Sequence, residues 1–218
     1  MIFSNERKLT LSAWLRNNHR VEYEIPLKLQ KFLFFYEVFS KVAGEKADFD
    51  HLRGYRNGPV FSNVWGDYTK ERYSFELRSQ DCFENFSNII DTDIAQQCSF
   101  IVATLSEYEL SALTHKMNIW KCKEKFINLG YEQVSLCESD FNSADFQLIK
   151  ILGSMYPLRM VNSSEIIRLG DFYFVISKKD FRNFTEQHID TLSIIVQEEE
   201  LHNPVFIEID EKGRLIID

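Results

Sequence analysis

Apolar positions recur at helical spacing through the first half of the chain. The pattern predicts a helix over residues 4–17 and another over 27–42. Pro26 suits the first turn of the second helix, and Gly44 suits the position just past its end. Apolar residues cover nearly the whole circumference of this second helix, so we expect it at the centre of the core.

The pattern further along the chain predicts more helices, separated by loops. Residues 45–58 are expected to form a loop, and Gly58-Pro59 to begin a helix. Residues 74–100 fit either a helix or a turn-rich segment, and both alternatives stay open. The sequence Ser106-Glu107-Tyr108-Glu109 has the spacing of a capping box, which predicts that a helix follows it.

Strand patterns occur in the last third of the chain. Residues 172–176 are aromatic and β-branched and predict a strand, and residues 192–196 are a second candidate. Apolar runs at 205–209 and 215–217 flank a turn containing Gly213, which predicts a β-hairpin. A partner could add a strand to the free edge of such a hairpin.

These patterns predict an α+β fold in two parts. A mainly helical domain is expected over residues 1–130, followed by a smaller α+β region with antiparallel strands over 131–218. We expect the boundary between the two within 131–140. The acidic run Glu198-Glu199-Glu200 fits a solvated turn or strand end, or an acidic patch for a basic partner.

Composition and charge narrow the classes of function. The chain has 218 residues, of which 44% are hydrophobic and 27% charged, as in ordinary globular proteins. Its net charge of −8 disfavours non-specific binding to nucleic acids or anionic membranes and fits either solubility or a basic protein partner. No apolar run approaches the roughly 18 residues of a membrane span. Because the first eight residues are too polar for a signal peptide, we expect a cytoplasmic protein without membrane contact.

The sequence carries no strong metal, cofactor or catalytic motif. Cys82, Cys98, Cys122 and Cys137 include no C-x-x-C pair, so four reduced thiols are expected. Asp48-Phe49-Asp50-His51 is the cluster that a metal-dependent hydrolase or nuclease would use, but no second acidic cluster accompanies it. Glycine-rich phosphate loops and hydrolase motifs are absent. We therefore expect no catalytic residues, no metal and no cofactor.

Three motifs occur in an order typical of one known family. Residues 27–36 read LKLQKFLFFY, residues 55–60 read YRNGPV, and residues 113–115 read LTH with Trp120 after them. In this order they resemble the Panacea domain family, a phage-associated family of SocA-like antitoxins. The resemblance covers roughly residues 5–130. It also implies that Thr114-His115 packs beside the Gly58-Pro59-Val60 turn.

The resemblance implies a binding function rather than catalysis. Panacea domains are antitoxins that neutralise unrelated toxins by direct contact, and at least one member is an adaptor that delivers its toxin to a bacterial protease. The implied partners are a cognate toxin and, for an adaptor, a protease unfoldase. Residues 131–218 are then a candidate specificity region. The alternatives are a phage- or mobile-element-derived interaction module without a toxin, and a metal-dependent hydrolase or nuclease.

The candidate partner-binding residues lie in and between these motifs. Lys28 and Lys31 either extend to solvent from the helix edge or frame a partner site. Gly58-Pro59 is interpreted as a helix start, either a local cap or an acceptor for an anionic group of a partner. Aromatic residues are included because they are enriched in binding hot spots. The full set is Lys28, Lys31, Tyr36, Arg53, Tyr55, Arg56, Gly58, Pro59, Trp65 and Tyr68.

Overall fold

The computed structural model describes residues 1–131, 133–198 and 200–217. Its helices are α1 (Glu6–Asn18), α2 (Arg20–Glu24), α3 (Pro26–Ala43), α4 (Ser62–Lys70), α5 (Arg72–Phe86), α6 (Thr92–Thr104), α7 (Glu107–His115), α8 (Asn118–Lys121), α9 (Glu124–Asn128), α10 (Ser143–Met155), α11 (Leu158–Ser163), α12 (Lys178–Phe181) and α13 (Glu186–Glu198), with the 3-10 turns η1 (Ser87–Ile89) and η2 (Glu138–Asp140). Its strands are β1 (Leu52–Tyr55), β2 (Gly58–Phe61), β3 (Val134–Ser135), β4 (Ser164–Leu169), β5 (Phe172–Ser177), β6 (Val205–Ile209) and β7 (Leu215–Ile217).

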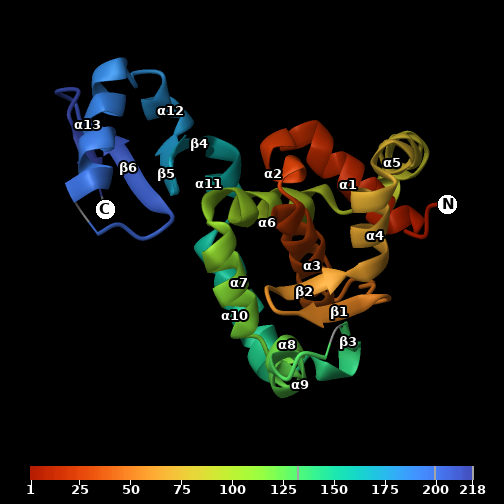
Figure 1. Ribbon diagram of the computed structural model, residues 1–218. Coiled ribbons are helices and arrows are strands. Elements are labelled where there is room, and N and C mark those ends of the chain that lie inside the picture. Colours follow the sequence, from red (N-terminus) through yellow and green to blue (C-terminus); the bar gives the residue numbers. More distant parts are fainter. Residues whose placement is uncertain (132, 199, 218) are drawn as a thin grey trace.

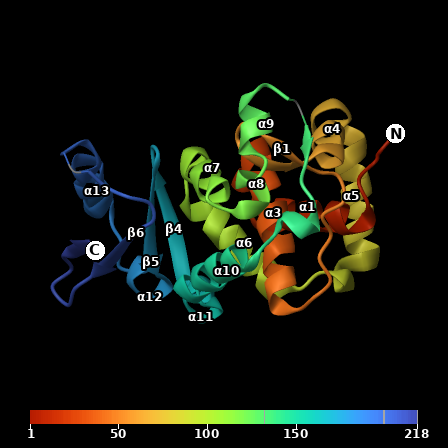
Figure 2. The same ribbon diagram turned by 90° about the horizontal axis from the view of Figure 1, so that it is seen from below.

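These elements form a helical body and a smaller lobe of strands and helices (Figure 1). The body contains α1 to α11 and a small sheet, and the lobe contains β4 to β7 with α12 and α13. Both views place β4 and β5 between the body and α13 (Figures 1 and 2). The predicted α+β class, with a mainly helical N-terminal part, is confirmed.

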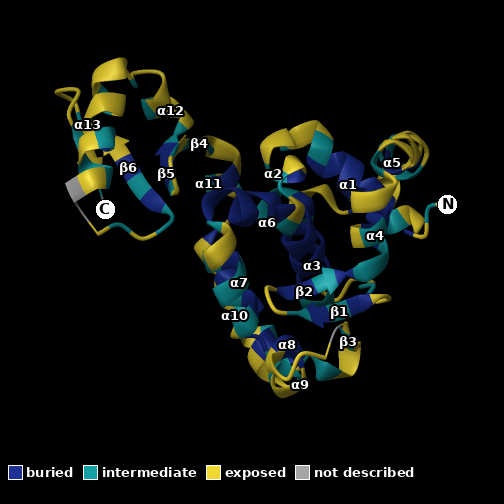
Figure 3. Cartoon of the chain, in the orientation of Figure 1, coloured by how far each residue is buried: buried dark blue, intermediate teal, exposed yellow. Residues whose placement is uncertain are grey.

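Helix α3 lies at the centre of the body, as predicted. It is buried over residues 28–40 (Figure 3), and it contacts α1, α2, α6, α7 and α10 as well as β2. The helix begins at Pro26, and Gly44 ends it in the left-handed conformation, with φ of 82°. The capping box at Ser106 and Glu109 is also confirmed, because each side chain bonds to the backbone of the other residue at the start of α7.

The interpretation of Gly58-Pro59 as a helix start is wrong. These residues open strand β2, which pairs antiparallel with β1 from Leu52↔Phe61 to Tyr55↔Gly58. Gly58 adopts a φ of 104°, which glycine can adopt but which does not occur in a right-handed helix. Pro59 is tolerated in β2 because this strand lies at the edge of the sheet. The helix α4 begins only at Ser62, so no helix N-terminus lies at Gly58.

A second sheet organises the lobe, in the order β4-β5-β6-β7. The β4–β5 and β6–β7 pairs are antiparallel, and β5 pairs parallel with β6. The predicted strand at 172–176 and the predicted C-terminal hairpin are confirmed, with Gly213 at φ of 75°. The predicted strand at 192–196 is wrong, because these residues lie in α13. There, helical spacing places Leu192 and Val196 against the apolar cluster of the sheet.

Two apolar clusters hold these parts together. The larger cluster belongs to the body, and it includes Leu136, Ile149 and Leu152 from beyond residue 130. The smaller cluster lies between the lobe sheet and α13. Strand β5 contributes to both, because Val175 packs into the larger cluster whereas its neighbours Phe174 and Ile176 pack into the smaller one. The division at 130/131 stays a prediction.

Two further predictions concern the acidic run near the C-terminus and membrane-spanning helices. The acidic run at 198–200 contains Glu199, which lies outside the described residues, as does the side chain of Glu198. Searching the described helices for a stretch long and apolar enough to span a membrane finds none.

Candidate functional site

The structure separates the predicted partner-binding residues into buried and accessible groups. Buried in the body are Lys28, Lys31, Tyr36, Gly58, Pro59 and Tyr68. Arg53 and Tyr55 are half-buried, and Arg56 and Trp65 are exposed. The interpretation that Lys28 and Lys31 extend to solvent is wrong, because other elements cover both. The ten residues therefore do not form one continuous surface, and partner binding by the accessible ones stays a prediction.

Lys31 lies beneath the turn of the β1–β2 hairpin. Its Nζ donates to the backbone oxygen of Asn57 at 2.6 Å and to Oγ1 of Thr114 at 3.0 Å. Within the described ranges no carboxylate contacts it, and burial lowers the pKa of Lys31 to about 7. A Cβ built on Gly58 would lie only 2.2 Å from this Nζ, so Gly58 gives Lys31 its space. Thr114 packs beside the Gly58 turn, as the resemblance implies.

Lys28 connects α3 to the lobe. Its Nζ is 3.2 Å from the hydroxyl oxygen of Tyr173 and 4.4 Å from the centroid of that ring. Burial, reinforced by the nearby Arg168, lowers the pKa of Lys28 to about 8. Tyr68 is equally enclosed, since its hydroxyl donates to the backbone oxygen of Tyr23 at 2.8 Å. These contacts give Lys28 and Tyr68 structural roles.

A cleft of about 1590 Å³ opens on the body. Four segments line it, within residues 2–9, 45–53, 88–91 and 135–138, together with Tyr36, Ser40 and Arg78. Of the predicted residues, only Tyr36 and Arg53 belong to this lining. We call this space the cleft. Its volume exceeds the roughly 300–1,000 Å³ of small-molecule pockets, so it has room for a segment of polypeptide.

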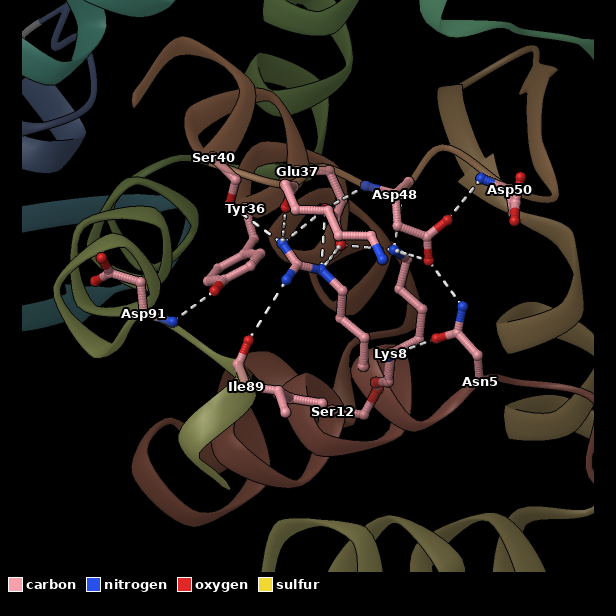
Figure 4. A network of polar contacts seen from close by, with 12 residues as sticks. Asn5, Lys8, Ser12, Tyr36, Glu37, Ser40, Asp48, Asp50, Ile89 and Asp91 are labelled. Carbon is pink, nitrogen blue, oxygen red and sulfur yellow. Dashed lines mark hydrogen bonds and ion pairs between the residues drawn. The ribbon is translucent and has the colours of Figure 1, made fainter. Parts of the chain in front are cut away.

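Helix α3 supplies the buried anchor of the cleft wall (Figure 4). The carboxylate of Glu37 is fully buried and receives two parallel hydrogen bonds from Arg7, Nε to Oε1 at 2.9 Å and Nη2 to Oε2 at 3.0 Å. Arg7 also donates to the backbone oxygen of Lys46 at 2.9 Å. The hydroxyl of Tyr36 accepts the backbone N–H of Asp91 at 2.7 Å. These bonds connect α1, α3, the 45–51 loop and the start of α6.

Lys8 completes this network from the other side of Glu37. Its Nζ lies 2.6 Å from Oε1 of Glu37 and 3.0 Å from Oδ2 of Asp48, and it donates to the backbone oxygen of Asp48 at 2.9 Å. Burial alone would raise the pKa of Asp48, but Lys8 and hydrogen bonds from Asn5 and Asp50 outweigh burial and lower it. The loop carrying Asp48 is thereby held to α1 and α3.

A buried aspartate holds the N-terminal segment that lines the cleft. Oδ2 of Asp67, in α4, accepts the backbone N–H groups of Phe3 and Ser4 at 2.9 and 2.7 Å and the Ser4 hydroxyl at 2.6 Å. Residues 3 and 4 therefore have a defined path before α1 begins. The N-terminal segment and the 45–51 loop are therefore both held by hydrogen bonds to buried carboxylates.

Unlike the buried charges of the cleft wall, several charged side chains at the cleft rim have no partner among the described residues. The side chains of Glu6, Glu45 and Asp50 are exposed and make no hydrogen bond or ion pair with any residue that the structure describes. Among the cations of the lining, Arg7 is paired with Glu37 and Arg78 with Asp81. Lys46 has no carboxylate partner among the described residues, and Arg53 donates only to the neutral hydroxyl of Ser135. Three free carboxylates against these two cations leave the rim with a small excess of negative charge.

The Asp48-Phe49-Asp50-His51 cluster lies on the cleft but is already committed to local structure. Oδ2 of Asp48 bonds to Lys8 and Asn5, and its Oδ1 accepts the backbone N–H of Asp50. His51 has a φ of 62° and directs its backbone oxygen to Ser62. In the part of the chain that the structure describes, no three His, Cys, Asp or Glu side chains are grouped to hold a metal ion.

Sequence reasoning missed the residues that build the cleft wall. Glu37 carried a usable signal, because a carboxylate in the middle of an almost wholly apolar helix must find a cation if it is buried. Arg7 and Lys8, adjacent in α1, were the available cations. Their pairing with Glu37 depends on how α1 packs against α3, which the local pattern does not specify.

No model of a known protein family, no curated protein and no solved structure matches the chain. The resemblance to Panacea domains therefore rests on the three motifs and stays a prediction.

Proposed function

We propose that this chain is a cytoplasmic, antitoxin-like protein that neutralises a cognate toxin by binding a basic segment of it in the cleft. Neither catalysis nor a cofactor is part of this proposal. The observation that carries it is the cleft itself, which is large enough for a polypeptide segment and has a rim of unpaired carboxylates. The order of the three Panacea-like motifs supports the same function independently.

Charge supports a basic partner. Glu6, Glu45 and Asp50 belong to two segments of the cleft lining, and exposed rim carboxylates of this kind attract a cationic segment before contact. The deeper charges of Arg7, Lys8 and Glu37 are already satisfied by one another. A partner therefore does not have to replace those ion pairs in order to bind.

Rigidity supports tight binding. Because the N-terminal segment and the 45–51 loop are held by buried hydrogen bonds, little ordering of these parts of the lining is required on association, and less of the binding free energy is lost. Residues 135–138 form one wall and come from the region that the resemblance implies to be specificity-determining. Variation in that wall would change which toxin segment fits.

The test begins with the tagged full chain expressed at native level in its own host. We expect one small basic protein to co-purify in stoichiometric amount, and this protein to stop growth when it is expressed alone. Co-expression of the full chain should restore growth. A triple variant, Glu6→Lys, Glu45→Lys and Asp50→Lys, should fail to restore it.

The matched control carries the same change of charge on the lobe. Asp190→Lys, Glu208→Lys and Glu211→Lys alter three exposed carboxylates far from the cleft lining, and this variant should restore growth as well as the wild type. Equal rescue by both triple variants would contradict the cleft as the binding site. Absence of any specific partner would contradict the antitoxin proposal and favour an interaction module without a toxin.

The same experiment distinguishes two mechanisms by which the toxin could be neutralised. Direct blockade predicts that growth is restored, and that the toxin level stays constant, in a host lacking the protease unfoldase. Delivery to a protease predicts that the unfoldase co-purifies and that rescue is lost without it. We favour direct blockade, because the cleft provides a binding site without any further partner.

A further inference from the structure

Two exposed cysteines from separate segments meet at one aspartate. Cys122 follows α8, and Cys137 precedes η2. The sulfur of Cys137 accepts the backbone N–H of Asp140, whose Oδ2 in turn accepts the backbone N–H of Cys137 at 2.8 Å. The carboxylate of the same Asp140 acts on the thiol of Cys122, whose pKa it helps to raise. Both sulfurs are therefore neighbours of a single residue.

Further contacts fix this arrangement. Asn118, at the start of α8, donates through Nδ2 to the backbone oxygen of Asp140 at 2.8 Å. Lys123, directly after Cys122, places Nζ 3.2 Å from Oδ1 of Asp140. The two cysteine-bearing segments are thus attached to each other by an ion pair and a hydrogen bond, in addition to the contacts of the sulfurs.

The local charges favour reaction at one sulfur first. Lys123 is the neighbouring cation, and its charge only partly offsets the rise in the pKa of the Cys122 thiol. Burial and the Asp140 carboxylate raise the pKa of the Cys122 thiol. The thiolate of Cys122 is therefore disfavoured, which leaves Cys137 to react first. By contrast, Cys82 and Cys98 are buried, and burial raises the pKa of each.

We propose that Cys122 and Cys137 form a thiol–disulfide exchange site for low-molecular-weight disulfides. The Cys137 thiolate attacks one sulfur of the small disulfide, forms a mixed disulfide and releases one small thiolate, which takes up the proton that Cys137 lost. Cys122, deprotonated in turn, attacks the sulfur of Cys137 and expels the second small thiol. One small disulfide is reduced to two thiols, and the two cysteines are oxidised to one disulfide.

The new bond would restrain the cleft. Cys137 lines the cleft between Leu136 and Glu138. The wall 135–138 is attached to β1 by the pairing of β3 and by the hydrogen bond from the Leu136 N–H to the Leu52 oxygen, and to α3 by the ion pair of Glu138 with Lys41. A Cys122–Cys137 disulfide would join this wall covalently to the end of α8. The exchange chemistry itself does not depend on the proposed antitoxin function.

The test uses the reduced, purified full chain and oxidised glutathione as the probe. Intact-mass measurement should show loss of two hydrogen atoms from the wild type, and a tryptic fragment should join the peptides containing Cys122 and Cys137. Cys122→Ser and Cys137→Ser should each gain one glutathione instead. A dithiol reductant should restore the original mass of the oxidised wild type.

A second sample shows whether the fold brings the two cysteines together. In urea, where all four thiols are accessible, we expect glutathione adducts on all of them and slower formation of the 122–137 link. Two glutathione adducts on the folded wild type, without the joined fragment, would overturn the proposal. Equal rates of linkage in folded and unfolded chains would overturn it as well.

Discussion

Two regions of the body keep a lysine out of water in different ways. Beside the cleft, Lys8 contacts the carboxylates of Glu37 and Asp48, and the charge of its amine is matched. Beneath the β1–β2 hairpin, Lys31 contacts a backbone oxygen and the hydroxyl of Thr114, and burial lowers its pKa to about 7. Both side chains are 1% exposed.

The difference shows that burial alone does not define the role of a charged residue. Lys8 is part of a network that must be charged to be satisfied, so removing a partner leaves an uncompensated ion. Lys31 has two acceptors, which a neutral amine with two N–H groups can satisfy. The stability of the Lys8 region should therefore depend on its ion pairs. The stability of the Lys31 region should depend on pH and on the space that Gly58 leaves above the amine.

The largest effect is expected for Glu37→Gln. This change removes the carboxylate that the buried Lys8 shares with the partly buried Arg7, and it should lower the free energy of unfolding by about 3–5 kcal/mol. Urea denaturation at pH 7 measures it. The exposed Glu211→Gln serves as the control and should change stability by less than about 0.5 kcal/mol. A loss below about 1 kcal/mol for Glu37→Gln would show that the network is not required.

Gly58→Ala tests the space above Lys31. The new Cβ meets Nζ of Lys31 at 2.2 Å and Oγ1 of Thr114 at 2.5 Å, at a φ of 104° that L-residues disfavour. We expect a loss of about 1–3 kcal/mol in thermal or urea unfolding. Gly213→Ala is the matched control, because Gly213 also has a positive φ but nothing within 4 Å of its Cβ. Equal losses would mean that backbone strain, rather than contact with Lys31, decides the cost.

The pH dependence of stability tests the amine of Lys31. Because its folded pKa of about 7 lies below the ordinary value, the unfolded chain binds more protons above pH 7, and stability should rise with pH. The contribution of one such group is at most about 1.4 kcal/mol per pH unit. Lys31→Met should remove this slope between pH 7 and 9 relative to the wild type. Parallel curves for the two proteins would contradict the lowered pKa.

A smaller effect of the same sign, in the acid range, is expected at Asp48. Its pKa is lowered in the folded protein, so its contribution is present above the unfolded pKa and is lost as pH falls through the folded pKa. Asp48→Asn should cost about 1 kcal/mol at pH 7 and progressively less in acid. Stability measured at pH 7 and pH 3 checks this, and an equal loss at both pH values would contradict it.

The elements that sequence predicted correctly are those whose signals are local. Gly44 ended α3 and the Ser106–Glu109 capping box began α7, because each depends on a few adjacent residues. The C-terminal hairpin followed in the same way from Gly213. By contrast, Gly58-Pro59 suited both a helix start and an edge strand, and the pairing of β2 with β1 decided between them. The run 192–196 was ambiguous because a short apolar segment fits both the periodicity of a helix and that of a strand.

The candidate site was less accessible to sequence reasoning than the fold. The cleft is assembled from four segments between Ile2 and Glu138, so no single motif specifies it. Lys28 and Lys31 were expected at the surface, since a helical pattern does not show that Tyr173 and the β1–β2 hairpin cover them. The acidic loop at Asp48 and Asp50 was noticed, but the role of Asp48 became evident only beside Lys8.

The most direct test of the central claim is the affinity of the purified partner for three forms of the full chain. Calorimetry would compare the wild type with the Glu6→Lys, Glu45→Lys, Asp50→Lys variant and with the lobe control Asp190→Lys, Glu208→Lys, Glu211→Lys. If each rim carboxylate contributes about 1 kcal/mol, the cleft variant should bind roughly a hundredfold more weakly. The lobe control should bind as the wild type does. Equal affinities for the wild type and the cleft variant, or equal weakening in both variants, would contradict the cleft as the binding site.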